Sequence, residues 1–599
     1  MMESVWIDVR YAVRSITKAP AFAAIVIATL ALGVGANTAV FSVLNAVLLK
    51  PLPYANAHEL LRLYLTYRGQ DNYLPGPAVI DFKERSRTVD IAALYTYRSE
   101  GVDLTDRAQP ERVGRLQVSA DYFRVMGVNL VAGRPFEAAD ERPNANVAVV
   151  STRIWQDYLG RSADAIGRTL TLDATKYRIV GVVAEDFEDP LQAGIEVWTP
   201  LDMATARTEG WDNNYLSAVG RLRPGVSMAQ ASAELASISA SQQSHYAARD
   251  ARVARIAKLQ DDLSGRASGL LLVLQGAVAI LLVIACVNVA GLFLSRASAR
   301  ESELAVRAAL GCSRARLVRQ VLVESLMLSV AGAAVGLALG ISVQRALVAV
   351  APFTFPAQPQ LDATVFAFSL AVAAVAGLFF GLAPALQFTR PDLEMVLRES
   401  SRGAGGSRRQ TRTRNAFVVC QVALAVVLLV GAGLLLRTVE RLIHERTGIR
   451  TDNILTFEVN LPEGRYADPA RRARLYVDLA QRLESLPGVT AAGAVSRLPL
   501  TGPYHQWGTR RPDRAPDAQP RMQPQQRVVE ANYFEALSIP ILQGRGFDAR
   551  DDARAPHRVL ISRSMASALY PGEDPVGRPL NVAGRPSEII GVVGDVPIG

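Results

Sequence analysis

The side chains that most often carry out chemistry are few in this sequence and stand far apart. The 599 residues include five histidines and three cysteines, with no C-x-x-C, H-E-x-x-H or G-x-S-x-G motif among them. None of the five lysines follows a glycine, so the chain has no G-x-x-x-x-G-K-[ST] loop to bind nucleotide phosphates. We therefore predict no metal site, no cofactor site and no enzyme activity. If ATP drives this protein, a partner subunit is expected to bind it.

A more informative spacing occurs in the segment ARESELAVRAALGCSRARLVRQVLVESLMLSVAGAAVGLALG, which starts at residue 299. Glu303 and Arg307 are one helical turn apart, and Gly311 follows as a helix breaker. The opposite face is small and apolar, with Leu304, Ala305, Ala308 and Ala309. This pattern predicts a short amphipathic helix. The alternative is a loop whose arginines only set the orientation of the chain in a membrane.

Glycines recur every four residues in two apolar stretches. The first stretch carries Gly332, Gly336 and Gly340, and the second carries Gly377 and Gly381. Small residues at this spacing let helix backbones approach closely, so we predict that these faces pack against other helices. The alternative is chance, since glycine is common in membrane helices.

Long charge-free runs indicate membrane-spanning helices. The chain is 50% hydrophobic, and a bilayer is crossed by about 20 mostly apolar residues in one helix. The first run is too long for a secretory signal and lacks an obvious cleavage site, so we interpret it as an uncleaved anchor. We predict five spans, at residues 21–49, 267–295, 321–344, 363–389 and 415–436.

Glu324 is an acidic residue at the inner end of the third span. An ionised group at this depth needs either water or a partner of opposite charge. Its carboxylate therefore either reaches the aqueous interface or pairs with an arginine of the preceding loop. The sequence leaves both possibilities open.

The net charge of +9 lies in three short segments beside the spans. Residues 1–20 carry +1, the loop 296–320 carries +4, and the linker 390–414 carries +4. Because cytoplasmic loops hold the excess of basic residues, these segments are expected in the cytoplasm. Residues 50–266 and 437–599 then lie outside. The charge thus reflects membrane orientation, and we expect no nucleic acid partner.

The two outside regions repeat each other. SADYFRVMGVNLVAGRPFEAAD at Ser119 matches EANYFEALSIPILQGRGFDARD at Glu530, an offset of 411. Strand-like runs such as YRIVGVV alternate with helical patterns such as the one that starts at Ser227, which predicts compact α+β domains. The second copy is incomplete, because its own three helices would reach about position 800. We expect either a fragment or a shortened gene.

The segment from residue 299 closely resembles the cytoplasmic loop and following helix of the MacB/FtsX-type (type VII) ABC transporter permeases. The opening DVRYAVRSITKAPAFAAIVIATLALGVGANTAVFSVLNAVLLKPLPY and the tandem repeat resemble the duplicated acidobacterial-type group of that family. The resemblance implies an FtsX-like permease domain at 267–389 and MacB-like periplasmic core domains on both sides of it. It also implies that Glu303, Arg307, Gly311 and Arg314 face a cytoplasmic ATPase.

The predicted fold class is therefore a membrane α-helical protein with extracytoplasmic α+β domains, built as a tandem duplication with an incomplete second half. The expected function is that of a permease subunit that couples ATP hydrolysis by a separate cytoplasmic ABC ATPase to export or extraction of an envelope substrate. The alternative is a regulatory module that activates a partner such as a cell-wall hydrolase. Expected partners are that ATPase, membrane lipids, and a periplasmic adaptor or envelope protein, at the bacterial inner membrane.

Overall fold

A computed structural model gives the fold of most of the chain. It describes residues 2–67, 69–95, 101–105, 111–185, 187–246, 251–299, 314–350, 362–387, 408–444, 448–459, 461, 466, 468–500, 508–515 and 524–596. The chain divides into two compact units. The first consists of Met1–Leu172 with Lys176–Leu435, and the second of Asp173–Thr175 with Leu436–Gly599.

Five helices among the described residues are long and apolar enough to cross a membrane. Charge-free apolar segments form helices in lipid because a helix pairs its own backbone polar groups. Each predicted span overlaps one of these helices. They are α2 (Pro20–Leu44) with its π-helical continuation η1 (Asn45–Leu49), α8 (Leu259–Ala299), α10 (Arg314–Val350), α11 (Ala363–Gln387) and α13 (Arg408–His444).

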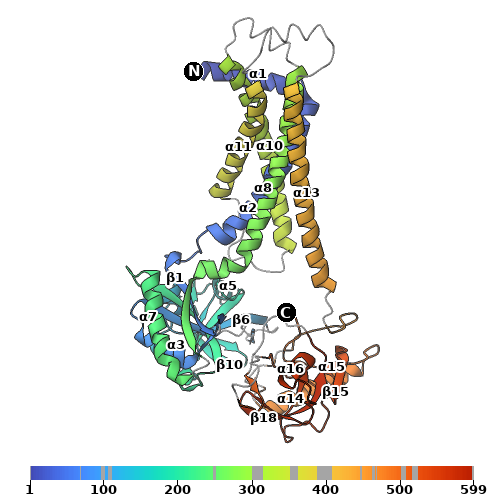
Figure 1. Ribbon diagram of the computed structural model, residues 1–599. Helices are drawn as coiled ribbons and strands as arrows, with labels where there is room; N and C mark the ends of the chain where they lie inside the picture. Colours follow the sequence, from blue (N-terminus) through green and yellow to red (C-terminus); the bar gives the residue numbers. More distant parts are fainter. Residues whose placement is uncertain are drawn as a thin grey trace. The chain divides into compact units, whose positions relative to one another are not determined.

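Four of these helices form a packed bundle in the first unit. Helix α2 runs along α8 and α10, and α11 packs against α8 and α10 (Figure 1). Their shared core contains Leu30, Val289, Leu328, Ala376 and Phe380. Because lipid tails are as apolar as these side chains, close contact between helices stabilises the bundle more than removal from water does.

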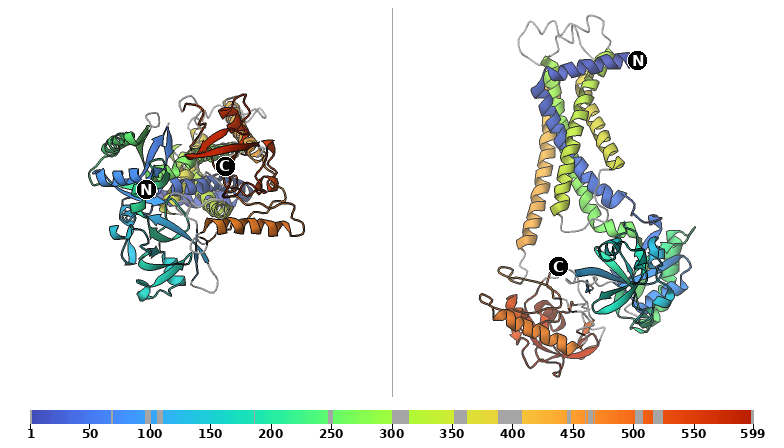
Figure 2. Two further views of the ribbon diagram at one scale, coloured as in Figure 1. Left: turned by 90° about the horizontal axis from the view of Figure 1, so that it is seen from below. Right: turned by 180° about the vertical axis from the view of Figure 1, so that it is seen from behind.

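An additional helix, α1 (Met2–Thr17), precedes the bundle. It ends just before Pro20, which occupies the first turn of α2, where a missing backbone N–H costs nothing. Helix α1 packs against α2 and α10 and lies across one end of the bundle (Figures 1 and 2). The sequence predicted only a cytoplasmic segment at residues 1–20, so this helix is a feature that the structure adds.

The residues between α2 and α8 form an α+β domain with one large sheet. Its strand order is β11-β8-β10-β9-β5-β6-β4-β12-β1-β13, with β2, β3 and β7 on its margins. The strands are β1 (Leu60–Tyr67), β2 (Gln70–Asn72), β3 (Leu74–Pro75), β4 (Val89–Tyr95), β5 (Val102–Leu104), β6 (Glu111–Val118), β7 (Leu130–Gly133), β8 (Val147–Val150), β9 (Thr169–Leu172), β10 (Thr175–Val183), β11 (Ile195–Pro200), β12 (Asn214–Leu222) and β13 (Arg252–Lys258).

Short helices cover this sheet. The helix predicted from Ser227 is present as α7, and the Ser227 hydroxyl accepts a hydrogen bond from the Gln230 N–H as its N-cap. One core lies under α3 and α7 and includes Phe82 and Leu235. The helices are α3 (Gly76–Arg85), α4 (Tyr122–Met126), α5 (Thr152–Asp157), α6 (Met203–Thr208) and α7 (Met228–Ser241), with 3-10 turns at Ala57–Glu59, Ala138–Asp140, Ala163–Ala165 and Gln242–His245.

The second unit contains a smaller sheet with strand order β14-β17-β18-β15, and β16 also pairs with β18. Its core includes Met565, Leu580 and Ile589. The elements are α14 (Pro469–Glu484), β14 (Thr509–Arg510), α15 (Tyr533–Ala536), β15 (Ile541–Gly544), β16 (Arg558–Ser562), α16 (Arg563–Leu569), β17 (Pro579–Val582) and β18 (Arg585–Val593).

The two units share a strand pairing at the positions of the sequence repeat. Strand β10 pairs antiparallel with β7, where Gly181 faces Gly133, and parallel with β8. Strand β18 pairs antiparallel with β15, where Gly591 faces Gly544, and parallel with β16. Equivalent residues therefore occupy equivalent ladder positions, and the internal duplication is confirmed.

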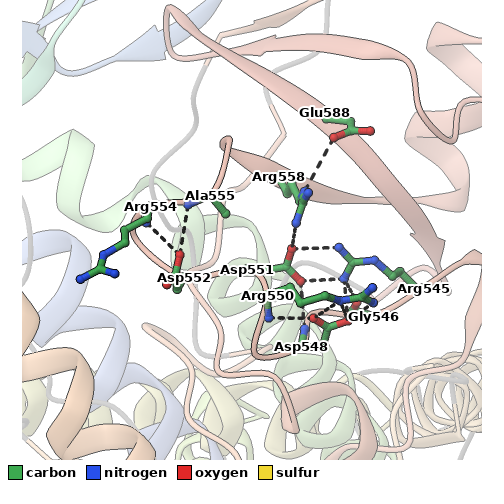
Figure 3. Close-up of polar contacts among 10 residues, drawn as sticks. All are labelled: Arg545, Gly546, Asp548, Arg550, Asp551, Asp552, Arg554, Ala555, Arg558 and Glu588. Atoms are coloured by element: carbon green, nitrogen blue, oxygen red, sulfur yellow. Dashed lines mark hydrogen bonds and ion pairs between the residues drawn. The ribbon is translucent and has the colours of Figure 1, made fainter.

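An arginine–aspartate contact is also repeated. Arg134 Nη1 donates to Asp140 at 2.8 Å, and Arg545 Nη1 donates to Asp551 at 2.7 Å (Figure 3). In the second copy Arg558 donates to the same aspartate at 2.7 Å. The hydrogen bonds from Arg545 and Arg558 hold the pKa of the Asp551 carboxyl well below its usual range. The contact holds the end of one strand against the turn that follows it.

Candidate functional site

The predicted ATPase-facing residues belong to the segment between α8 and α10. Glu303, Arg307 and Gly311 lie outside the described residues, and Arg314 is the first residue of α10. The residues that the structure does describe are those at the two ends of this segment. The candidate site is therefore built from the end of α8, the start of α10 and the helix α1.

Ser15, Arg296 and Glu324 form a buried polar cluster that joins three helices. The Ser15 hydroxyl donates to Oε1 of Glu324 at 2.8 Å, and Arg296 Nη1 lies 3.6 Å from the same oxygen. Arg296 Nη2 donates to the Ser15 carbonyl at 2.9 Å. Its guanidinium also lies over the Phe22 ring, 4.4 Å from the centroid. Of the two interpretations of Glu324, the structure shows the pairing with an arginine.

A second ion pair fixes α1 to the start of α10. Arg319 Nε donates to Oδ2 of Asp8 at 2.6 Å, and the Asp8 side chain is only 6% exposed. Asp8 and Ser15 are seven residues apart, so two helical turns place them on one face of α1. Through this face α1 contacts both helices that frame the segment 300–313. The end of α8 and the start of α10 thus both contact α1.

The first set of predicted glycines lies where α10 meets α2. A Cβ built on Gly332 would lie 2.7 Å from Cβ of Leu30, and one on Gly336 would lie 2.8 Å from the Ala31 carbonyl oxygen. A Cβ on Gly340 would lie 3.0 Å from the Gly35 oxygen. Real Cβ atoms essentially never make contacts under 3.0 Å, and a contact of 3.0 Å is tighter than most of those that they make. These three positions therefore bring the two backbones into direct contact.

The second set lies where α11 meets α10. A Cβ on Gly377 would lie 3.1 Å from Cβ of Ser329, and one on Gly381 would overlap the Ser325 hydroxyl. Both serines are fully buried, and the Ser329 hydroxyl donates to the Ala373 carbonyl oxygen. A serine hydroxyl thus serves as a polar contact between two tightly packed helices.

Helix α2 carries further buried polar side chains toward its other end. The Asn37 amide donates to the Val278 carbonyl oxygen at 2.8 Å and accepts a hydrogen bond from Gln275 at 3.1 Å. The Thr38 and Ser369 hydroxyls are 2.9 Å apart. Polar groups in an apolar bundle fix the register of neighbouring helices, because a shift would leave them without partners.

Helix α8 connects the bundle directly to the sheet. Strand β13 ends at Lys258 and α8 begins at Leu259, with no loop between them. The Tyr64 hydroxyl of β1 donates to the Asp262 carboxylate at 2.7 Å, and burial raises the pKa of Tyr64, so it remains a donor. The Gln260 amide donates to the Lys50 carbonyl oxygen at 3.0 Å. The end of α2 and the start of α8 are thus fixed to the same sheet edge.

Sequence reasoning did not find Asp8, Ser15, Tyr64 or Asp262. A weak signal for α1 exists in retrospect, since Asp8, Ala12 and Ser15 recur at helical spacing. The partners of these residues are hundreds of positions away, however, and one sequence contains no direct record of such contacts. Within the described ranges, no three His, Cys, Asp or Glu side chains gather as a metal site would require.

These features define a class of protein: a membrane protein whose helical bundle is continuous with an α+β domain, and whose chain contains a second copy of part of that domain. Comparison with known families agrees. The MacB-like periplasmic core domain matches residues 23–238 and 416–599, and the FtsX-like permease C-terminal domain matches residues 276–393. The chain belongs to the MacB/FtsX-like family of ABC transporter permeases. The narrower likeness to the acidobacterial-type group stays a prediction.

Several curated relatives are similar to part of the chain. The pyoverdine export ATP-binding/permease protein PvdT of Pseudomonas syringae pv. syringae is 29% identical over 270 residues, 44% of this chain and 39% of that protein. The macrolide export ATP-binding/permease protein MacB of Hahella chejuensis is 25% identical over 285 residues, 47% of this chain and 42% of that protein. The chain spans about two fifths of the length of these relatives.

Among solved structures, the periplasmic region of MacB from Actinobacillus actinomycetemcomitans matches 35% of this chain and 93% of that chain. The sequence identity is 14% and the TM-score is 0.27. The family assignment therefore rests on the family models.

Proposed function

We propose that this chain is the transmembrane permease subunit of a transporter that exports or extracts an envelope substrate. In this proposal a separate cytoplasmic ATPase binds and hydrolyses ATP, and the permease converts its motion into a rearrangement of the periplasmic domains. Support comes from the family and from relatives whose names include export. The positive segments beside the spans favour an inner-membrane location with the α+β domains on the periplasmic side.

The observation that carries this proposal is the continuity of α8. The helix has 41 residues, about 60 Å at 1.5 Å per residue. One end bears Arg296, beside the proposed ATPase-docking segment, and the other end continues from β13. A helix of this length that joins a sheet without a loop moves together with it. A displacement at the docking segment can therefore reach the sheet. This coupling does not require substrate to pass through the bundle.

The helix contacts suggest how such a displacement spreads. Because α1 contacts both Arg296 and Arg319, we propose that the two ends of the docking segment move as one body. Glu303, Arg307, Gly311 and Arg314 remain the proposed contact residues for the ATPase. The glycine contacts of α10 with α2 and α11 would transmit the same motion to the neighbouring helices.

A charge reversal in the docking segment tests this proposal. The full chain, purified from its native membrane, should retain an ATPase that a photoreactive ATP analogue labels. Arg307→Glu should lose that ATPase because the reversed charge opposes docking. Arg345→Glu is the matched control, since Arg345 is exposed near the other end of α10. Failure of the unaltered chain to retain an ATPase, or equal retention by both variants, would contradict the proposal.

A second measurement separates transport from regulation. Deletion of the gene should stop release of a substrate from the envelope, and that substrate should stimulate ATP hydrolysis by the purified complex. A stable complex with a periplasmic hydrolase, without any release defect, would instead favour the regulatory function.

A further inference from the structure

Helix α1 has a second face that the contacts with the bundle leave exposed. Its buried face holds Asp8, Ala12 and Ser15. On the opposite face Trp6 is 69% exposed and Val13 is 45% exposed. Among residues 6–18 whose side chains the structure describes, Arg10, Arg14, Thr17 and Lys18 are also exposed.

The apolar and the basic residues of this exposed face occupy different parts of it. At 100° per residue, Val13 and Trp6 lie at one edge of the exposed arc, and Arg10, Arg14 and Lys18 follow toward the other edge. None of the three cations forms an ion pair with a described carboxylate. The outer face of α1 thus has an apolar edge beside a basic edge, as in helices that lie in a membrane interface.

Helix α1 lies directly before the first membrane-spanning helix. Only Lys18 and Ala19 separate it from α2, which begins to span the membrane at Pro20. The helix runs across the ends of the bundle in both side views (Figure 1; Figure 2, right). The Asp8–Arg319 and Ser15–Glu324 contacts hold it at this level. The outer face of α1 is therefore close to the point at which α2 enters the membrane.

We propose that the outer face of α1 binds anionic lipid in the leaflet beside it. Trp6 and Val13 enter the upper acyl region, and Arg10, Arg14 and Lys18 contact the lipid phosphates. Tryptophan is favoured at this depth because its ring is apolar and its N–H is polar. The surface selects anionic over zwitterionic lipid because three cations lie along about 12 Å of helix without a partner among the described carboxylates. This inference requires no ATPase.

Quenching of Trp6 by brominated lipid tests the proposal on the full chain. The other four tryptophans, Trp155, Trp198, Trp211 and Trp507, lie outside the five predicted spans. The protein is reconstituted in phosphatidylcholine and phosphatidylglycerol, with bromine on the acyl chains of one lipid at a time. Brominated phosphatidylglycerol should quench a component of the emission that Trp6→Phe lacks. Brominated phosphatidylcholine should quench it less.

Removal of the cations should abolish this preference. In a chain with Arg10→Gln, Arg14→Gln and Lys18→Gln, the preference of Trp6 for phosphatidylglycerol should fall at least about fivefold, the effect expected of one such cation. Arg345→Gln should leave it unchanged. An unaltered melting temperature in detergent shows that the variants fold.

Three results would overturn the proposal. Absence of Trp6-dependent quenching by either lipid would show that Trp6 does not lie in the membrane. Equal quenching by both lipids, unaffected by the triple substitution, would show that this face does not select anionic lipid. Loss of quenching when a co-purified protein is present would assign the face to a protein partner.

Discussion

The hydroxyl of Ser15 donates a hydrogen bond of 2.8 Å to Oε1 of Glu324, a residue 309 positions away in the chain. The same carboxylate oxygen lies 3.6 Å from Nη1 of Arg296. One buried carboxylate thus connects α1, α8 and α10 at the end of the bundle where the proposed docking segment begins. Its removal should affect the stability of the whole bundle.

We predict that Glu324→Ala lowers the free energy of unfolding of the detergent-solubilised chain by about 3 kcal/mol, because it deletes the buried carboxylate that faces the largely shielded Arg296. Ser15→Ala should cost about 1 kcal/mol, the value of one hydrogen bond. Thermal unfolding followed by circular dichroism measures both. Arg345→Gln serves as the control, and a loss for Glu324→Ala no larger than that of the control would show that the cluster does not stabilise the bundle.

Gly336→Ala should weaken the contact between α10 and α2. The added Cβ would lie 2.8 Å from the Ala31 oxygen and 3.0 Å from the Gly35 nitrogen, so the backbones must separate. Overpacking of this kind costs about 1–3 kcal/mol. Gly276→Ala in α8 is the matched control, since a Cβ there would have no atom within 4 Å. Equal melting temperatures for the two variants would contradict the prediction.

The stability of the turn around Asp551 should depend on pH. The folded-state pKa of Asp551 lies below the unfolded value of about 3.9, so its contribution is complete above that value and is lost as the pH falls toward the folded-state pKa. Hydrogen exchange of peptides within 541–562, corrected for intrinsic rates, should show protection that declines below about pH 4.

Asp551→Asn should remove this pH dependence and leave protection low throughout. Asp552→Asn is the control, because the described partners of Asp552 are the backbone N–H groups of Arg554 and Ala555 (Figure 3). A pH dependence that survives in Asp551→Asn would assign it to another group.

Membrane orientation can be tested with single cysteines in a chain whose three native cysteines are replaced by serine. Ser232→Cys on the exposed face of α7 should react with an impermeant thiol reagent from outside intact spheroplasts. Arg316→Cys at the start of α10 should react only after permeabilisation. Ser119, where the first repeat begins, is unsuitable as a reporter because its side chain is fully buried. The opposite pattern of reactivity would reverse the predicted topology.

Much of the architecture could be predicted from the sequence because it depends on local composition. A run of 31 uncharged residues from Ala19 to Leu49 is sufficient to indicate a helix in lipid. The repeat that begins at Ser119 and Glu530 is visible because equivalent ladder positions keep similar residues. The capping pattern at Ser227 is also local, because it involves only residues within four positions of one another.

The choice of partners could not be predicted, because it depends on helices that meet only in three dimensions. Spacing indicated that Gly336 and Gly381 lie on packing faces, but the structure decides that the first meets Gly35 and the second meets Ser325. Glu324 could have faced water, and only the fold brings Ser15 and Arg296 to it. A periodic pattern records which face of a helix is apolar or small, whereas the position of every other helix determines what that face contacts.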